Sequence, residues 1–511
     1  MRLPFPTRVS LQKTLLFAAA VFVAQLLEHT DPAFSVLFFC YILLSAIAFN
    51  IAGGFSRASG TYIFWFASLT CIVGGLWKIV LGEPANTNLL SPSATLATYI
   101  VSMATMIAAL FISKRIVGKP VGLARLVRAD SVNLGVASLG CLLANELATV
   151  ATWFLPGGSG SISTIIIQLN VFLPLSILLG TIHSIRSSGG RRSVNVISLL
   201  AALQIFVFFG LIGYSKQGMF TPIVCWGIAA ASQRYRLRLW QIVLLIAFSV
   251  YAVMVLSPLS QVARGIVNPY AGFTERLELA TDLLSHPVRL RRLYKDAYGT
   301  DDNSVAGFAQ GYFDTPQGLL DRLNIIKTDD RLVTYTLQGH TVGSFRVFYY
   351  FLNWIPHIIL PNKESLVPAG VTLPGNYYAH EVGGLLSPDD YSTGISFSPS
   401  AEAFHMNMWF GIVLVGGFVW ILLFASVDWI CGDLRKSPYG LLAMVAFAHV
   451  APESLIGGLV YFIFFQNLGI VVAIFFCSYF APILGTLLYG SPVTRRYGTR
   501  PAPLMVADAT P

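Results

Sequence analysis

The sequence predicts an all-α polytopic integral membrane protein. Of its 511 residues, 55% are apolar and only 11% are charged, and the mean hydropathy is +0.68. A soluble domain has about 45–50% apolar and about 25% charged residues. The apolar residues form long runs, whereas a membrane β-barrel would need alternating segments of about ten residues. Helices are expected because they satisfy their own backbone groups in lipid.

Twelve apolar runs approach the roughly 20 helical residues that cross a bilayer core about 30 Å thick. About twelve transmembrane helices are therefore predicted. The runs lie at residues 11–28, 33–53, 60–81, 93–113, 131–154, 162–185, 194–214, 219–233, 239–258, 403–430, 438–452 and 466–489. The chain then divides into nine helices in 1–258, a large loop at 259–402, three helices in 403–490 and a tail at 491–511.

The charge distribution predicts the orientation, because Lys and Arg near spans stay on the cytoplasmic side. If the N-terminus lies inside, the segments on that side carry 20 of the 33 basic residues. The long loop, on the other side, holds 15 of the 24 acids. Both termini are thus expected in the cytoplasm and the loop outside. The basic residues are scattered rather than gathered in one patch, which argues against nucleic acid as a partner.

Cysteine and histidine spacing indicates neither a disulfide framework nor a zinc site. The six cysteines lie in or beside the apolar runs, and none is in the long loop. His380 and Glu381 lack the second histidine of an HExxH motif. Asp329 and Asp330 could be taken for the carboxylate pair of a metal-dependent glycosyltransferase, but two adjacent acids are a weak signal and loop acids are usually solvated. No metal and no cofactor are expected.

The long loop is predicted to carry amphipathic helices that lie on the membrane. Apolar residues recur at helical spacing in 273–294, and the basic run at 289–295 suits a solvated or headgroup-facing surface. A helix is expected at 321–332, and an aromatic helix at 343–356 is expected at the outer interface. The stretch 376–381 is predicted to be flexible.

Several polar residues near the outer side could bind a ligand. The eighth run covers only about 22 Å, so Lys216 should sit below the outer surface at a helix N-terminus, which favours an anion; a snorkelling lysine is the alternative. Arg322 and Arg331 carry the planar donor fork that suits phosphate, with salt bridges to nearby aspartates as the alternative. One face of the aromatic helix is expected to be polar. This polar strip would lie at the lipid boundary, or it would be an ordinary solvent-facing side. The strip consists of Arg346, Tyr350, Asn353 and His357.

These features resemble the Wzy-type O-antigen polymerases of bacteria, which join oligosaccharide repeat units. The matching motifs are Tyr-Ser-Lys-Gln-Gly at 214–218, Ile-Pro-His at 355–357, Pro-Asn-Lys at 361–363, Gly-Ile-Ser at 394–396, Glu402, and Asn-Met-Trp-Phe-Gly at 407–411. The topology is similar over nearly the whole chain, and the residues match near 216 and from about 322 to 411. One departure is His357, where the family often has arginine.

The resemblance implies a GT-C-like helical fold in the bacterial inner membrane with a periplasmic loop. It implies a metal-independent transfer of a growing glycan from undecaprenyl diphosphate onto a lipid-linked repeat unit. Membrane lipids, the undecaprenyl-diphosphate-linked oligosaccharide and a chain-length regulator protein are the implied partners.

This reaction needs cations for the departing diphosphate and a base for the acceptor hydroxyl. Glu402 is the first candidate for the base and His357 the second. Glu402 also has a structural alternative, as a first-turn residue that complements the helix dipole beside a Ser398 or Ser400 cap. The cation candidates are Lys216, Arg322, Arg331, Arg346 and Lys363, and the remaining binding candidates are Tyr350, Asn353, His380 and His405.

Two other functions remain open. A transporter or flippase for lipid-linked oligosaccharides would place charged residues at mid-membrane depth in several spans. The predicted spans are nearly free of charge, which favours an enzyme. A ligase-like glycan transferase would need the same diphosphate site and acceptor groove as a polymerase, so the sequence hardly separates those two.

Overall fold

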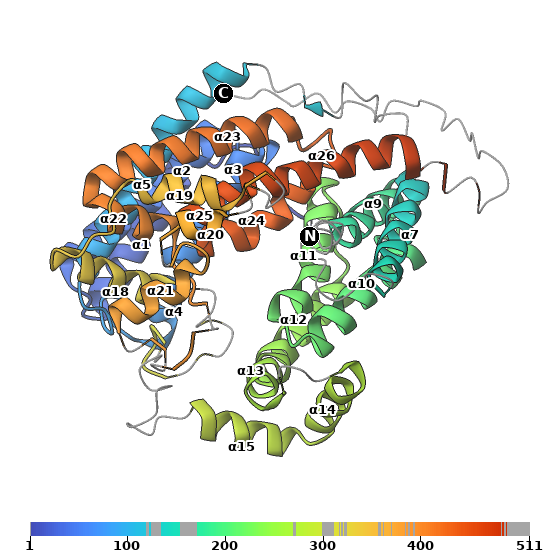
Figure 1. Ribbon diagram of the computed structural model, residues 1–511, viewed down its shortest axis with the longest axis horizontal. Helices are drawn as coiled ribbons and strands as arrows, with labels where there is room; N and C mark the ends of the chain where they lie inside the picture. Colours follow the sequence, from blue (N-terminus) through green and yellow to red (C-terminus); the bar gives the residue numbers. More distant parts are fainter. Residues whose placement is uncertain are drawn as a thin grey trace.

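The structure is a computed structural model that describes residues 2–118, 122–123, 134–153, 171–268, 272–298, 311–315, 317, 320, 324–355, 359–360, 362–368, 370–383, 385–386, 389–391, 394–481, 483–484 and 487. Throughout these ranges the regular structure is helical, apart from one isolated bridge between Arg2 and Arg236. The predicted all-α class is confirmed (Figure 1).

Each of the twelve apolar runs overlaps a helix or a chain of helices. These are α1 (Leu11–Leu27), α2 (Pro32–Ala52), α3 and α4 (Ala58–Ala67, Val73–Leu81), α5 (Pro92–Val117), α7 (Leu134–Trp153), α9 (Phe172–Ser187), α10 (Val196–Gln204), α11 (Lys216–Ser232), α12 and α13 (Leu239–Tyr251, Ser257–Ile266), α22 and α23 (Pro399–Phe410, Gly417–Cys431), α24 (Leu441–Glu453), and α25 and α26 (Ile456–Tyr461, Asn467–Phe475). Wide π-helical turns join several of these pairs, among them Gly411–Gly416 between α22 and α23.

Six of the described helical segments are long and apolar enough to cross a membrane: Pro32–Ser56, Ala58–Leu81, Pro92–Val117, Leu239–Ile266, Pro399–Cys431 and Ile456–Phe480. Four shorter apolar helices accompany them, at Leu11–Leu27, Leu134–Thr149, Val196–Ile212 and Leu441–Glu453. A helical membrane protein is therefore supported, while twelve spans and a GT-C-like arrangement stay predictions. The last segment begins at Ile456, earlier than the predicted 466, so only Ser454 and Leu455 separate it from α24.

The connections between helices meet in two groups, as alternating spans require. At one end of α2, Thr30 Oγ1 accepts the N–H of Ala85 at 2.9 Å, which joins the α1–α2 and α4–α5 connections. At the other end, the Ser56 carbonyl accepts the N–H of Leu434 at 3.0 Å. The 21 residues of α2 separate these ends by about 31 Å, close to the thickness of a bilayer core.

The long loop is largely helical and shares its core with the apolar helices. Its helices are α14 (Phe273–Ser285), α15 (Pro287–Tyr298), α18 (Ile326–Leu337), α19 (Arg346–Asn353), α20 (Lys363–Leu366) and α21 (Pro374–Val382). Side chains of α18, α19 and α21 belong to the same buried cluster as those of α2, α5 and α23. The loop is thus docked on the helix bundle rather than folded as a separate domain. In Figure 1, α14 and α15 lie at the bottom, apart from α18 and α21 on the left.

One expectation for the loop was wrong, one was right in kind but shifted in its bounds, and one was right. The stretch 376–381, predicted to be flexible, lies in α21, where Tyr378 and Ala379 are buried. The helix predicted at 321–332 begins at Ile326 and continues to Leu337. The basic run on α15 does form an exposed surface, in which Arg289, Arg291 and Arg292 surround the buried Leu290.

Asp330 attaches α18 to the start of α5. Its carboxylate accepts hydrogen bonds from the backbone N–H groups of Leu90 and Ser91 and from Thr95 Oγ1, the last at 2.8 Å. Both amides lie just before the first residue of α5, Pro92. The N-terminal end of a helix carries positive partial charge, so a carboxylate there is stabilised. The expectation that loop acids are solvated was wrong, because Asp330 is buried.

Asp329 makes the corresponding attachment to the start of α22. Its carboxylate accepts Tyr99 Oη–H at 2.6 Å and the Ser398 N–H at 2.8 Å. Burial raises the pKa of Asp329 from 3.8 to about 7, against the hydrogen bonds from Ser398 and Tyr99, which lower it. Between pH 3.8 and about 7 the folded chain keeps a proton on Asp329 that the unfolded chain has lost. The free energy of unfolding therefore falls as the pH rises, and the contribution of Asp329 is lost as the pH passes about 7.

We therefore expect the melting temperature of the protein in detergent to fall between about pH 5 and about pH 8, and to fall less in Asp329→Asn. The asparagine amide can still accept from Ser398 N–H and donate to the Tyr99 oxygen, but it does not titrate. Asp282→Asn, at an exposed carboxylate paired with Arg289, is the matched control and should keep the wild-type slope. Equal slopes in Asp329→Asn and the wild type would contradict the assignment.

A kink divides α22 near its middle. Asn407 and Met408 leave helical geometry, and Met408 has a φ of 46°. A residue other than glycine rarely adopts this left-handed region, at a cost on the order of 1 kcal/mol. Residues 399–406 therefore form a short separate helix that packs beside α18, ahead of the long apolar segment that follows. Ser398 caps it by accepting the Ala401 N–H, as one sequence alternative expected.

Candidate functional site

Three short helices bring a charged and phenolic cluster together at the end of the bundle where the loop docks. Arg346 and Tyr350 come from α19, Tyr378 from α21, and Glu402 from the short helix before the kink. All four are buried, with Arg346 6% exposed and Glu402 0% exposed. Arg346 and Tyr350 are four residues apart and so share one helix face, as the sequence predicted.

Glu402 is held by three donors. Its Oε1 accepts the hydroxyl of Tyr350 and, at 2.8 Å, the hydroxyl of Tyr378. Its Oε2 accepts the backbone N–H of Ile456, the first residue of α25. Glu402 therefore links α19, α21, α22 and α25, in addition to lying in the first turn of its own helix. A base must come within hydrogen-bond reach of the hydroxyl that it deprotonates, and Glu402 would need one of the two tyrosines to move.

Burial, and then the charge of Glu402, raise the pKa of Tyr350 well above its usual value. The same two effects raise the pKa of Tyr378. Both phenols consequently keep their protons and act as donors to the carboxylate. The cluster thus holds one buried cation and one buried acid, connected through hydroxyl groups.

Arg346 lies next to this carboxylate but reaches it through Tyr350. Its Nε donates to the Tyr350 hydroxyl oxygen at 3.2 Å, and its guanidinium lies 4.9 Å and 5.2 Å from the ring centres of Tyr377 and Tyr378. Burial acts to lower the pKa of Arg346, but Tyr378, Tyr350 and Glu402 outweigh it and raise the pKa, so the guanidinium stays charged. Its Nη2 is buried and has no hydrogen-bond partner among the described residues.

A second layer of polar contacts lies behind Tyr378. His405 is fully buried, with its Nδ1 2.9 Å from Thr336 Oγ1 and its Nε2 3.5 Å from Glu381 Oε2. The ring of His405 meets that of Tyr378 edge to face, at 5.3 Å between centres. Burial acts to raise the pKa of Glu381, but His405 and Tyr377 outweigh it and lower that pKa. His405 therefore supports the cluster from inside the protein.

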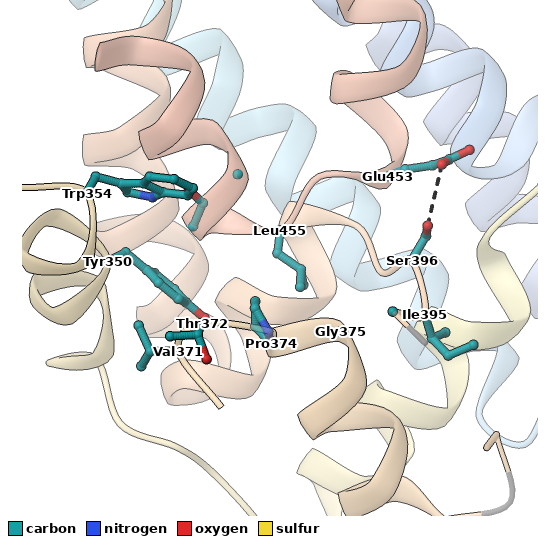
Figure 2. A pocket seen from close by; sticks show the side chains of 13 residues that line it. Tyr350, Trp354, Val371, Thr372, Pro374, Gly375, Ile395, Ser396, Glu453 and Leu455 are labelled. Carbon is teal, nitrogen blue, oxygen red and sulfur yellow. Dashed lines mark hydrogen bonds between the residues drawn. The ribbon is translucent and has the colours of Figure 1, made fainter. Parts of the chain in front are cut away.

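A half-open cavity of about 290 Å³ adjoins the cluster at Tyr350. Figure 2 shows Tyr350 and Trp354 on one side of it and Ser396 and Glu453 on the other. Ser396 Oγ donates to Glu453 Oε2 at 3.4 Å. Glycines make part of the wall, and a Cβ at Gly457 would lie 2.9 Å from the Tyr350 ring. The cavity thus has aromatic walls and a few convergent polar groups, which is the usual character of a small-ligand site.

The structure brings together four of the predicted site residues: Arg346, Tyr350, Glu402 and His405. Arg322 and His357 lie outside the described residues. In the described part of the chain, no group of three or more His, Cys, Asp or Glu side chains could hold a metal ion.

The other predicted residues lie elsewhere. Lys363 Nζ donates to the carbonyls of Asn353, at the C-terminal end of α19, and of Ile355, at 2.6 Å and 2.9 Å. Arg331 donates to the Gly383 carbonyl at 3.3 Å, and His380 contacts the Asp390 carbonyl at 2.9 Å. These contacts are with the backbone of the loop itself.

Lys216 is the first residue of α11, after the Ser215 cap, so the helix starts earlier than the predicted residue 219. The preceding Tyr214 contacts α13 and α14: its carbonyl accepts from Ser260, and its hydroxyl donates to the Arg276 carbonyl at 2.6 Å. The start of α11 thus lies against α13 and α14, and Figure 1 shows those two helices apart from α19 and α21.

Sequence reasoning missed Tyr378, Glu381 and Glu453. Tyr378 and Glu381 fell in the stretch predicted to be flexible, although Pro374, a residue type that is common at the first position of a helix, could have indicated a helix start. Glu453 lies just beyond the predicted eleventh run, where an acid at a helix end draws no attention. Its position on a cavity depends on segments far away in the chain.

Comparison with protein-family models, with curated proteins and with solved structures finds no match to this chain. The argument for function therefore rests on the residues and their geometry.

Proposed function

We propose that the protein is a membrane-embedded polymerase of O-antigen or exopolysaccharide repeat units, similar to the Wzy type. It would transfer a growing glycan from undecaprenyl diphosphate to a lipid-linked repeat unit at the periplasmic face of the bacterial inner membrane. One observation carries the proposal. The guanidinium of Arg346 is buried and has a free donor, and it lies on a loop helix that is docked at the end of an apolar bundle, beside a cavity open to ligand.

The reaction accounts for each part of this arrangement. The acceptor hydroxyl oxygen forms a bond to the anomeric carbon of the donor sugar, while the bond from that carbon to the diphosphate breaks and its electron pair leaves with the phosphate oxygen. Arg346 would stabilise the negative charge that develops there, since a preorganised charged donor in a dry site is effective. Glu402 would hold Tyr350 and Arg346 in place, and both lipid tails would stay in the bilayer.

The position of charge along the spans favours an enzyme over a flippase. In the six long candidate spans every Asp, Glu, Lys and Arg lies in the first or last turn, as with Glu402, Asp428 and Lys114. A transport path for a charged lipid-linked glycan would place polar groups at mid-membrane depth. A ligase-like glycan transferase shares the geometry and is separated from a polymerase by experiment.

Deletion of the gene in its host, followed by electrophoresis of surface glycan, tests the proposal. We expect the long-chain ladder to disappear while single repeat units remain attached, and a plasmid copy of the gene to restore the ladder. Loss of all attached glycan with lipid-linked polymer retained would indicate a ligase. Cytoplasmic accumulation of lipid-linked units would indicate a flippase, and an unchanged ladder would refute all three.

A further inference from the structure

We infer that the cavity at the α24–α25 connection is the acceptor-sugar site, and that Glu453 is the carboxylate that takes the proton from the attacking hydroxyl. This inference rests on the proposed function and adds to it a site and a catalytic residue. Glu453 ends α24, with two residues between it and the start of α25, and lies on the cavity wall opposite Tyr350 and Trp354 (Figure 2).

Glu453 is partly accessible, unlike Glu402. Its side chain is 27% exposed. Both of its polar contacts are made by Oε2, with His449 Nδ1 at 3.1 Å and Ser396 Oγ at 3.4 Å. Oε1 has no hydrogen-bond partner among the residues that the structure describes. One oxygen is therefore oriented by the protein, and the other has no partner within the described part of the chain.

The walls fit a sugar ring. The volume of about 290 Å³ lies near the lower end of the range for ligand sites and suits a single pyranose. The indole of Trp354 is fixed by its Nε1–H, which donates to the Gly457 carbonyl at 3.3 Å. Tyr350 and Trp354 thus present aromatic surface to the apolar C–H face of a sugar, while Ser396 and Glu453 face its hydroxyl groups.

Small residues keep the cavity open. Among the described residues, a Cβ at Gly394 would meet only Leu373 Cδ1 within 4 Å, at 3.9 Å. The cavity also touches the buried cluster, because Tyr350 lines the cavity and donates to Glu402. The acceptor would then lie next to the cation proposed for the diphosphate.

The chemical step balances with these groups. The acceptor hydroxyl transfers its proton to Glu453 Oε1 as its oxygen bonds to the anomeric carbon, and the diphosphate leaves with the electron pair of the broken bond. His449 acts as a positioning residue through Oε2. The protonated Glu453 then loses its proton to solvent through the open side of the cavity.

The test uses the deletion strain carrying full-length variants at equal membrane levels, and purified protein with lipid-linked repeat units extracted from that strain. Glu453→Gln should reduce chain extension by about 10²- to 10⁴-fold, the usual contribution of a general base. Gly394→Phe, which fills the cavity, should weaken acceptor use.

Glu278→Gln and Gly272→Leu are the matched controls, because both positions are exposed on or beside α14; they should extend chains like the wild type. A folded Glu453→Gln protein with full chain extension would overturn the inference while leaving the polymerase proposal in place. An unchanged glycan ladder in the deletion strain itself would overturn the polymerase proposal, and this inference with it.

Discussion

Replacement of Glu402 by alanine is expected to lower the free energy of unfolding by about 3–5 kcal/mol, the usual effect of removing one partner from a buried charged pair. The change removes the acceptor of the Tyr350 and Tyr378 hydroxyls and of the Ile456 N–H. It also removes a negative charge that acts on the buried Arg346. Thermal unfolding of purified protein in detergent should show a melting temperature lower by on the order of 5 °C or more.

Glu402→Gln provides the matched comparison. A glutamine can accept the Ile456 N–H through its Oε1 and donate to a tyrosine oxygen through its Nε2, so the helices stay connected and the loss of stability should be smaller. Glu278→Ala, at an exposed position, should remain within about 0.5 kcal/mol of the wild type. If Glu402→Ala melted with the wild type, the carboxylate would not be the link between α19, α21 and α25 that we describe.

Replacement of Arg346 by lysine should reduce chain extension by about 10²- to 10³-fold, the cost of losing one preorganised donor to developing negative charge. Lysine keeps the positive charge but loses the planar fork whose Nε holds Tyr350 at 3.2 Å while Nη2 remains free. Arginine and lysine are not equivalent at such a site. The measurement is the length distribution of surface glycan in the complemented deletion strain, with the membrane level of each variant determined in parallel.

Arg289→Lys is the control for this change. Arg289 is exposed on α15 and pairs with Asp282 at 2.8 Å, so its replacement should leave the glycan ladder unaltered. A ladder of normal length in Arg346→Lys, in a strain where deletion removes the ladder, would show that Arg346 does not bind the diphosphate. The cation would then have to be sought among Arg331, Lys363 and Lys216.

Local sequence patterns were sufficient to predict most of the helices, but not to predict which segments these helices contact. Hydrophobic run length found the apolar helices except α25, which lies between two predicted runs. The spacing of Arg346 and Tyr350 placed them correctly on one face of α19. The same reasoning misjudged the segment of α21, because its few apolar residues gave too weak a pattern. It also treated Asp329 and Asp330 as solvated, since nothing near them in the chain shows that the starts of α5 and α22 lie against α18.

The sequence by itself determined that the chain is a bundle of apolar helices with one large polar loop, and it named Arg346, Tyr350, Glu402 and His405 as chemically capable. Run length and helical period are local properties, so they can be read without knowing the fold. Only the tertiary structure decided that the Glu402 carboxylate accepts hydrogen bonds from two tyrosines and from the start of α25, whereas Glu453 lines a cavity. Those contacts join residues that are 24 to 54 positions apart, as in Tyr378 with Glu402 and Ile456 with Glu402. Their free energy depends on how helices pack, which no local pattern encodes.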